Sequence, residues 1–230
     1  VAKLREAGHE VVELKFPFEK IAWSYVELLS AEGGMRGFKE GLEGEELNPM
    51  YHFMYKMANV PNSVRPLLSG AMALIGQPRI AGLIAKAKAK TTYEFWHSVA
   101  NLKLTTAALL KKWKDMGLDA VVCPAGGVPA IPHGMSSKLA QGCSYTFIWN
   151  ALHFPAGVVP VSRVKEDEEP YEGKPDTITA AARKANKGSA GLPIGVQVAS
   201  LPWKDELCLR AMKCVEDAVG WTIPMPEALA

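Results

Sequence analysis

The stretch SYTFIWNALHFPAGVVPV, Ser144–Val161, decides the fold class predicted for this chain. It predicts an apolar helix over about Ser144–Leu152, a tight turn over Phe154–Gly157 and a strand over Val158–Val161. A strand that is apolar on both faces is typical of the interior of a sheet covered on two sides. A helix followed directly by such a strand indicates an α/β protein, and ordinary core packing is the plainest explanation of the pattern.

Three residues of this stretch carry more information than its hydrophobicity. Pro155 cannot continue the preceding helix, and Gly157 can adopt backbone angles that other residues avoid. Asn150 is a polar side chain within the apolar segment, so we expect it to have a buried hydrogen-bond partner. The stretch therefore predicts a fixed turn between a core helix and a core strand.

The rest of the chain alternates predicted helices and strands, which favours a single α/β domain built on one central sheet. The last predicted helix would bury Leu207, Ala211, Met212, Val215 and Ala218. The other predicted elements are a strand over Val11–Phe16, a helix over Ile21–Ala31, a helix over Thr92–Met116, a strand over Leu118–Pro124, a helix over Thr177–Lys187 and a strand over Gly191–Ala199.

Composition narrows the function classes. The chain is 48% hydrophobic and 22% charged, which is enough apolar content for a packed core and argues against disorder. A net charge of +2 does not suggest a nucleic-acid partner. The cysteines lack paired or Cys/His ligand spacing, so we expect free thiols and no metal site. Because Val1 is not Met and residues 1–7 resemble the end of a helix closed by Gly8, we expect a part of a longer protein.

Residues 61–90 form an unusually apolar segment. Val64–Gly76 is apolar nearly all round, Pro78 interrupts it, and Ile80–Ile84 resumes it before three closely spaced lysines. Neither half reaches the roughly 18–20 residues needed to span a bilayer. Two short apolar helices followed by basic residues fit an insert at a membrane surface, and they also fit a buried hairpin or an oligomer contact.

Four motifs resemble the amidase signature family, most closely its fatty acid amide hydrolase branch. They recur in that family's order and cover almost the entire chain. The resemblance implies the C-terminal half of the family's fold, a twisted mixed central sheet flanked by helices. It makes residues 1–230 one partial amidase domain, with 61–90 as an inserted helical cap. The motifs are AGHEVVELKFPF (Ala7–Phe18), LDAVVCP (Leu118–Pro124), SYTFIWNALHFPAGVVPV (Ser144–Val161) and AGLPIGVQVASLPWKDELCLR (Ala190–Arg210).

The resemblance also implies an activity. Members of this branch hydrolyse long-chain fatty acid amides, with esters as a further substrate class, through a serine nucleophile, a bridging serine and a lysine base, without metal or cofactor. None of these catalytic residues is expected in this chain, because the family's glycine- and serine-rich nucleophile loop does not occur in it. The local look-alikes at 126–127, 136–138 and 188–191 lack that context. The chain alone is therefore predicted to be inactive.

The residues carried over from the family fall into two groups. Val26, Glu27, Ala140, Cys143 and Phe147 match positions that line the acyl channel, and ordinary core packing is the alternative for each. The predicted membrane cap consists of Leu67, Leu68, Leu74, Ile75, Ile80, Leu83 and Ile84.

The partners and location that follow are expectations of the same kind. They are a fatty acyl amide lipid, a membrane surface, no nucleic acid, and an intracellular protein held peripherally on the cytosolic face of endomembranes. Relatives form dimers, and a homodimer stays open. The alternative function is that of a truncated, non-catalytic homologue that binds a lipid or a partner. A third hypothesis, from another class of function, is a structural or scaffold domain unrelated to amidases.

Overall fold

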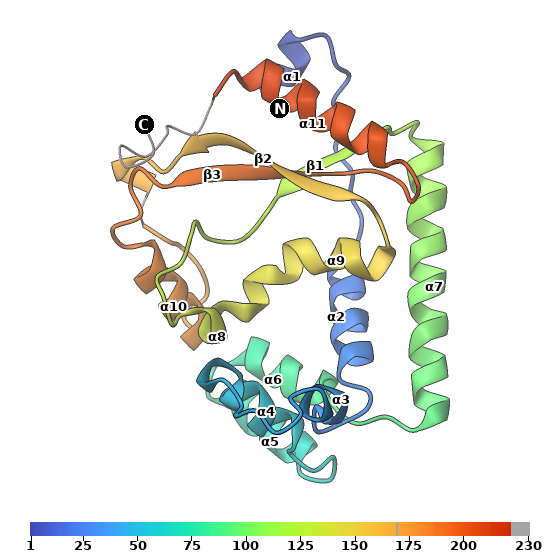
Figure 1. Cartoon of the computed structure of the whole chain (residues 1–230), viewed down its shortest axis with the longest axis vertical. Helices are drawn as coiled ribbons and strands as arrows, with labels where there is room; N and C mark the ends of the chain where they lie inside the picture. The colour runs from blue at the N-terminus through green and yellow to red at the C-terminus, as the bar shows by residue number, and fades with distance from the viewer. Residues whose placement is uncertain (169, 222–230) are drawn as a thin grey trace.

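The computed structural model describes residues 1–168 and 170–221, so the part of the single-domain prediction that covers 169 and 222–230 lies outside the described residues. A three-stranded sheet of order β1-β3-β2 lies at one end of the molecule (Figure 1). Its strands are β1 (Val121–Pro124), β2 (Ala156–Arg163) and β3 (Pro193–Ala199). The predicted α/β class is confirmed. Both pairings among the described strands are antiparallel, so these three strands do not themselves supply the parallel pairs of a mixed sheet.

Helices cover both faces of this sheet. In Figure 1, α11 and α1 lie on one side, α9 on the other, and the long α7 runs along the edge of the molecule toward α3–α6 at the opposite end. The helices are α1 (Ala2–Glu6), α2 (Phe18–Leu29), α3 (Arg36–Glu40), α4 (His52–Ala58), α5 (Arg65–Leu74), α6 (Pro78–Lys86), α7 (Thr92–Asp115), α8 (Ser136–Leu139), α9 (Ser144–Leu152), α10 (Thr177–Asn186) and α11 (Asp205–Val219), with short 3-10 turns η1 (Pro49–Tyr51), η2 (Ala140–Cys143) and η3 (Glu166–Glu168).

Small residues let the layers approach closely. A Cβ on Gly157 of β2 would lie 2.4 Å from the Met212 sulfur of α11, and one on Gly195 of β3 would lie 2.5 Å from a Val158 methyl carbon on β2. The β2–β3 ladder shifts register between Pro160 and Ser162, at a residue that has no N–H to donate. A side chain at Gly195 would thus overlap the neighbouring strand, whereas one at Gly157 would displace the flexible Met212 side chain.

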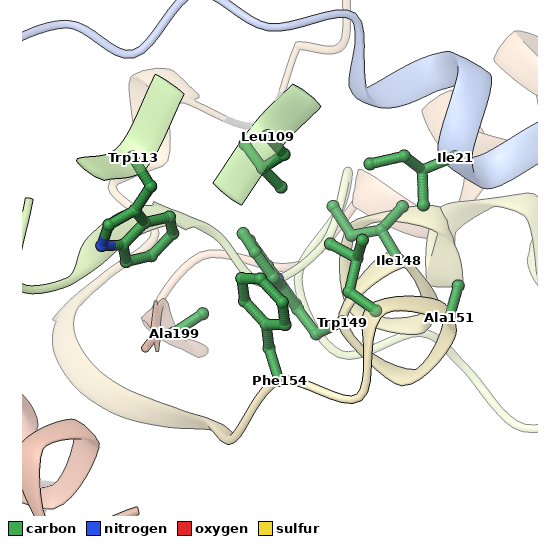
Figure 2. Close-up of a cluster of buried hydrophobic side chains, with 9 residues drawn as sticks. Ile21, Leu109, Trp113, Ile148, Trp149, Ala151, Phe154 and Ala199 are labelled. Carbon is green, nitrogen blue, oxygen red and sulfur yellow. The ribbon is translucent and has the colours of Figure 1, made fainter. Parts of the chain in front are cut away.

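The main core lies between the sheet, α2, α7 and α9, and Figure 2 shows its side chains converging. Trp113 of α7 and Trp149 of α9 are both buried, and both contact Phe154, at ring-centroid distances of 5.8 and 6.0 Å. Each large aromatic side chain buries on the order of 150–250 Å². The turn after α9 is thus fixed by Phe154 as well as by Pro155.

The predicted helix over Ser144–Leu152 and a strand after it are confirmed, but the strand begins at Ala156, within the predicted turn. It is an outer strand of the described sheet with Val158 49% exposed, so the expectation of an interior strand is wrong. The expectation for Asn150 is also wrong. Asn150 is exposed, because it lies on the face of α9 that turns away from Ile148 and Trp149. Its carbonyl accepts a hydrogen bond from the His153 amide at the end of the helix. Asn150 is therefore a surface residue of a helix that is buried on its other face.

Two further expectations are corrected. Val11–Phe16 forms no strand among the described residues, since side chains of neighbouring helices take its carbonyls: Arg5 donates to the Val11 carbonyl and Lys112 to the Lys15 carbonyl. On α11, Leu207 lies largely at the surface whereas Cys208 is buried among Val159, Val198 and Val215. The other predicted positions of this helix, Ala211, Met212, Val215 and Ala218, are buried or half-buried as expected.

Candidate functional site: a channel wall and a surface hairpin

The predicted channel residues come from two places that the structure brings only partly together. Phe147 of α9 packs on Tyr25 of α2 at a ring-centroid distance of 5.3 Å, next to the half-buried Val26. Ala140 and Cys143, on η2 just before α9, are both exposed. Phe147 thus lies in the contact between α2 and α9, while Ala140 and Cys143 lie at the surface before it.

Glu27 does not belong to an apolar wall. Its carboxylate lies 2.7 Å from the Lys86 ammonium and 3.3 Å from that of Lys90, and the Ser98 hydroxyl donates to it at 3.4 Å. Burial raises the pKa of the Glu27 carboxyl, but hydrogen bonds and charge from Lys86 and Lys90 outweigh it, so the pKa falls below its ordinary value. Glu27 therefore presents a paired carboxylate at this position.

Glu27 instead joins three segments of the chain. Lys86 ends α6, Lys90 lies in the link to α7, and Ser98 belongs to α7. The Lys90 side chain is only 6% exposed, and Glu27 is the carboxylate that pairs with it. A hollow of about 410 Å³ opens beside this carboxylate, lined by Lys20, Trp23, Ser24, Glu27, Lys86, Ser98, Asn101, Leu104 and Thr105.

The hairpin of α5 and α6 presents an apolar surface. The two helices that the break at Pro78 predicted are confirmed. Leu67, Leu74 and Ile75 are strongly exposed, Leu74 at 89%. Leu68, Ile80 and Leu83 are half-buried between the two helices and the rest of the molecule. Ile84 is only 2% exposed, so it is a core residue and cannot contact a membrane in this conformation.

Among the described residues, no helix is both long enough and apolar enough to cross a membrane. No three His, Cys, Asp or Glu side chains in ranges 1–168 and 170–221 gather where a metal ion could be held.

A buried arginine holds the hairpin together, and sequence reasoning missed it. The Arg65 side chain is 3% exposed at the start of α5 and donates to the carbonyls of Val60, Met57, Ala58 and Ile84 at 3.0, 2.8, 3.3 and 3.1 Å. Burial lowers the pKa of the Arg65 guanidinium below its ordinary value, and arginine remains charged in proteins. Carbonyls at the end of a helix attract a cation, so Arg65 joins the ends of α4 and α6.

A second arginine of the hairpin reaches a distant helix. Arg79 on α6 donates to both oxygens of Asp176, at 2.7 and 2.5 Å, and to the Thr179 hydroxyl. Asp176 caps α10 by accepting from the Thr179 amide at 2.8 Å. The Arg79 hydrogen bonds, which outweigh the cost of burial, lower the pKa of this carboxyl to about 2. The cap was readable from Asp176 and Thr179 in the sequence, but the partner nearly 100 residues away was not.

The serine look-alikes do not form a catalytic constellation. Ser136 and Lys138 are exposed on the short α8, with Ser137 between them half-buried. Ser189 is 1% exposed, and its hydroxyl has no hydrogen-bond partner among the described residues. A buried hydroxyl without a base in reach cannot serve as an activated nucleophile.

Taken together, the fold and the four motifs are those of the amidase class of proteins. The sequence profile of the family described as Amidase matches residues 1–209, and the chain belongs to this family.

Its relatives include "Fatty acid amide hydrolase 1" of Caenorhabditis elegans, 33% identical over 221 residues that make up 94% of this chain and 38% of the relative. "Fatty-acid amide hydrolase 1" of Sus scrofa is 32% identical over 93% of this chain and 38% of its own length. A solved structure titled "Fatty acid amide hydrolase" superposes with a TM-score of 0.63 at 18% identity, over 96% of this chain and 35% of that one. The chain thus spans less than two fifths of these relatives.

Proposed function

We propose that this chain is the C-terminal part of a serine hydrolase that cleaves long-chain fatty acid amides. In this proposal it supplies a wall of the acyl channel and a membrane-docking hairpin, and the Ser-Ser-Lys catalytic residues lie outside it. The single observation that carries the proposal is the match of nearly the whole chain to 38% of fatty acid amide hydrolases. The exposed leucines of α5 support the docking part, because contiguous apolar surface marks an interaction site.

Phe147 is the strongest candidate for contact with an acyl chain. It lies on α9 against Tyr25, and the adjoining Cys143 and Ala140 are open to whatever packs on this side. Binding of an acyl chain is mostly burial of methylenes, each worth about 0.8 kcal/mol. Phe147→Ala should therefore weaken binding of long-chain amides more than of short ones in the active protein.

Two measurements test the catalytic half of the proposal. The 230-residue chain should neither hydrolyse a long-chain fatty amide nor react with a fluorophosphonate probe. The longer protein that carries this sequence should do both. Probe labelling of the 230-residue chain that disappears when Ser137 or Ser189 is replaced would contradict the placement of the nucleophile outside it.

Vesicle sedimentation tests the docking half. Leu67→Glu with Leu74→Glu should reduce binding to phosphatidylcholine vesicles, because a charge within an apolar surface opposes its burial in lipid. Leu209→Glu is a matched control, since Leu209 is a similarly exposed leucine on the distant α11. Equal sedimentation of both variants and the wild type would rule out the hairpin as the docking surface, and light scattering of the same variants would show whether it instead joins two copies.

Intracellular placement on endomembranes is part of the same proposal. Cell fractionation, with and without the Leu67 and Leu74 substitutions, is the corresponding measurement.

A further inference from the structure

The fork between Arg79 and Asp176 joins the surface hairpin to α10 through two hydrogen bonds. A bidentate guanidinium–carboxylate pair fixes orientation as well as distance, since both groups are planar. The Asp176 side chain is 2% exposed, so water does not compete for its oxygens as it does at a surface pair.

A neutral contact lies beside this fork. The Gln77 side-chain carbonyl accepts from the Thr177 amide at 2.9 Å and from the Thr177 hydroxyl at 2.8 Å. The start of α6 is thereby bonded to the first turn of α10 through both Gln77 and Arg79. We refer to these contacts of Gln77, Arg79, Asp176, Thr177 and Thr179 as the α6–α10 latch.

The latch leads directly to the predicted channel wall. Ala182 and Ala185 of α10 pack in a buried cluster with Met135 and with Leu139 of α8, and η2 with Ala140 and Cys143 follows α8 without a break. Figure 1 shows α8 and α10 side by side next to the hairpin.

The other end of α6 is tied to α2. Lys86, its last residue, pairs with Glu27, which neighbours the predicted wall residue Val26. In the middle, Gly82 admits the Trp23 ring, since a Cβ there would lie 3.1 Å from it. Helix α6 therefore contacts α2, which carries Val26, and also α10, which packs on the helix that precedes Ala140 and Cys143.

We propose that Arg79 and Asp176 are positioning residues, which hold the apolar hairpin against the predicted channel wall and so set how far the wall opens to an acyl chain. This inference rests on the proposed function for its substrate, while the positioning itself is a property of the chain alone. Neither residue touches a reacting atom, so both act through the placement of α6. The surface that would dock on a membrane is thereby linked mechanically to the segment that carries Ala140 and Cys143.

Hydrogen exchange measured by mass spectrometry tests the positioning in the 230-residue chain. Asp176→Asn keeps the cap of α10, because Asn caps helices as well as Asp, but it removes the charge that binds Arg79. We expect exchange to become about tenfold faster or more in residues 65–86 and to change little in α10, since local opening follows the contacts that are lost. Arg79→Gln should reproduce this pattern, and Arg79→Lys should give a smaller effect because lysine cannot form the fork.

Lys111→Gln is the control, because Lys111 forms an exposed ion pair with Asp115 on α7 and should leave exchange in 65–86 unchanged. Unchanged exchange in 65–86 for both Asp176→Asn and Arg79→Gln would overturn the inference. So would acceleration that is equal in every segment, because that result would mean general destabilisation.

Kinetics of the longer, active protein test the link to the substrate. Asp176→Asn should change KM for a long-chain amide at least about threefold and leave kcat for a short, water-soluble amide unaltered, as expected when positioning and not chemistry is affected. Equal changes for both amides would overturn the role in channel opening. Absence of amide hydrolysis by the wild-type protein would overturn the proposed function and leave the exchange result standing.

Discussion

Replacement of Arg65 tests whether one buried cation holds the α4–α6 region together. Arg65→Met keeps most of the length and apolar volume of the side chain but removes all its donors. The Ile84 carbonyl is then left buried without a partner, and the carbonyls of Met57, Ala58 and Val60 lose partners in partly buried positions.

An unsatisfied buried acceptor costs about 1–3 kcal/mol, and each partly accessible acceptor costs less because water can replace the arginine. Since contributions of one side chain are not additive, we expect local opening of this region to become easier by about 3 kcal/mol. At 1.4 kcal/mol per factor of ten, this corresponds to exchange about a hundredfold faster in residues 52–86.

Native-state hydrogen exchange is the appropriate assay, because it reports each segment separately. Arg210→Met is the matched control, since Arg210 is exposed on α11 at the far end of the molecule. The reasoning would be refuted if the Arg65 variant exchanged like the control. It would also be refuted if Arg65→Lys, which retains a charge but not the planar fork, restored full protection.

Three further predictions follow from single contacts. Gly195→Ala should lower the free energy of unfolding by about 1–3 kcal/mol, measured by urea titration, because the new methyl group would overlap Val158. An unchanged urea midpoint would mean that β2 and β3 accommodate the methyl group without cost. Glu27→Gln should lower the free energy of unfolding by about 1–3 kcal/mol in the same titration, because it leaves the buried Lys90 side chain without its carboxylate partner. An unchanged midpoint would mean that the pair does not stabilise the fold. Folding lowers the pKa of the Asp176 carboxyl from 3.8 to about 2, so the ionised carboxylate stabilises the fold fully above about pH 4 and loses this effect as the pH falls through 2. The difference in urea midpoint between wild type and Asp176→Asn should therefore shrink between pH 4 and pH 2. A constant difference would contradict the lowered pKa.

The parts of the fold that were predictable are those governed by local pattern. The apolar run of α9, the proline and glycine after it and the break at Pro78 each act within a few residues, so their consequences could be inferred from sequence. The long helix Thr92–Met116 is likewise confirmed within one residue, and its stripe contributes Leu109 and Trp113 to the core.

What could not be predicted depends on partners distant in the chain. Arg79 meets Asp176 across 97 residues, and Arg65 meets Ile84 across 19, so neither arginine differs in local sequence from a surface residue. Val11–Phe16 has the composition of a strand but finds side-chain donors in place of a strand partner. Leu207 was predicted in place of Cys208 because both are apolar neighbours in the first turn of α11, and only Cys208 has Ala211, Met212 and Val215 at the helical spacings of three, four and seven.

The candidate site divides in the same way. The exposed leucines of α5 were predictable from an apolar helix too short to span a bilayer, whereas the burial of Ile84 depends on how α6 packs against its neighbours in the fold. Glu27 was assigned to the channel by its resemblance to a family position, and that resemblance alone did not show that Lys86 and Lys90 would form ion pairs with its carboxylate.

The proline in β2 has a consequence for behaviour in a concentrated solution. Pro160 lies beside the register shift of an outer strand, and β1, the other outer strand, is only four residues long and ends in Pro124. Neither edge of the described sheet therefore offers the long, regular row of unpaired backbone N–H and C=O groups that a strand of another molecule needs for addition into a fibril. If molecules of this chain self-associate, the geometry favours amorphous clustering through the apolar face of α5, which mild detergent would reverse, over templated polymerisation.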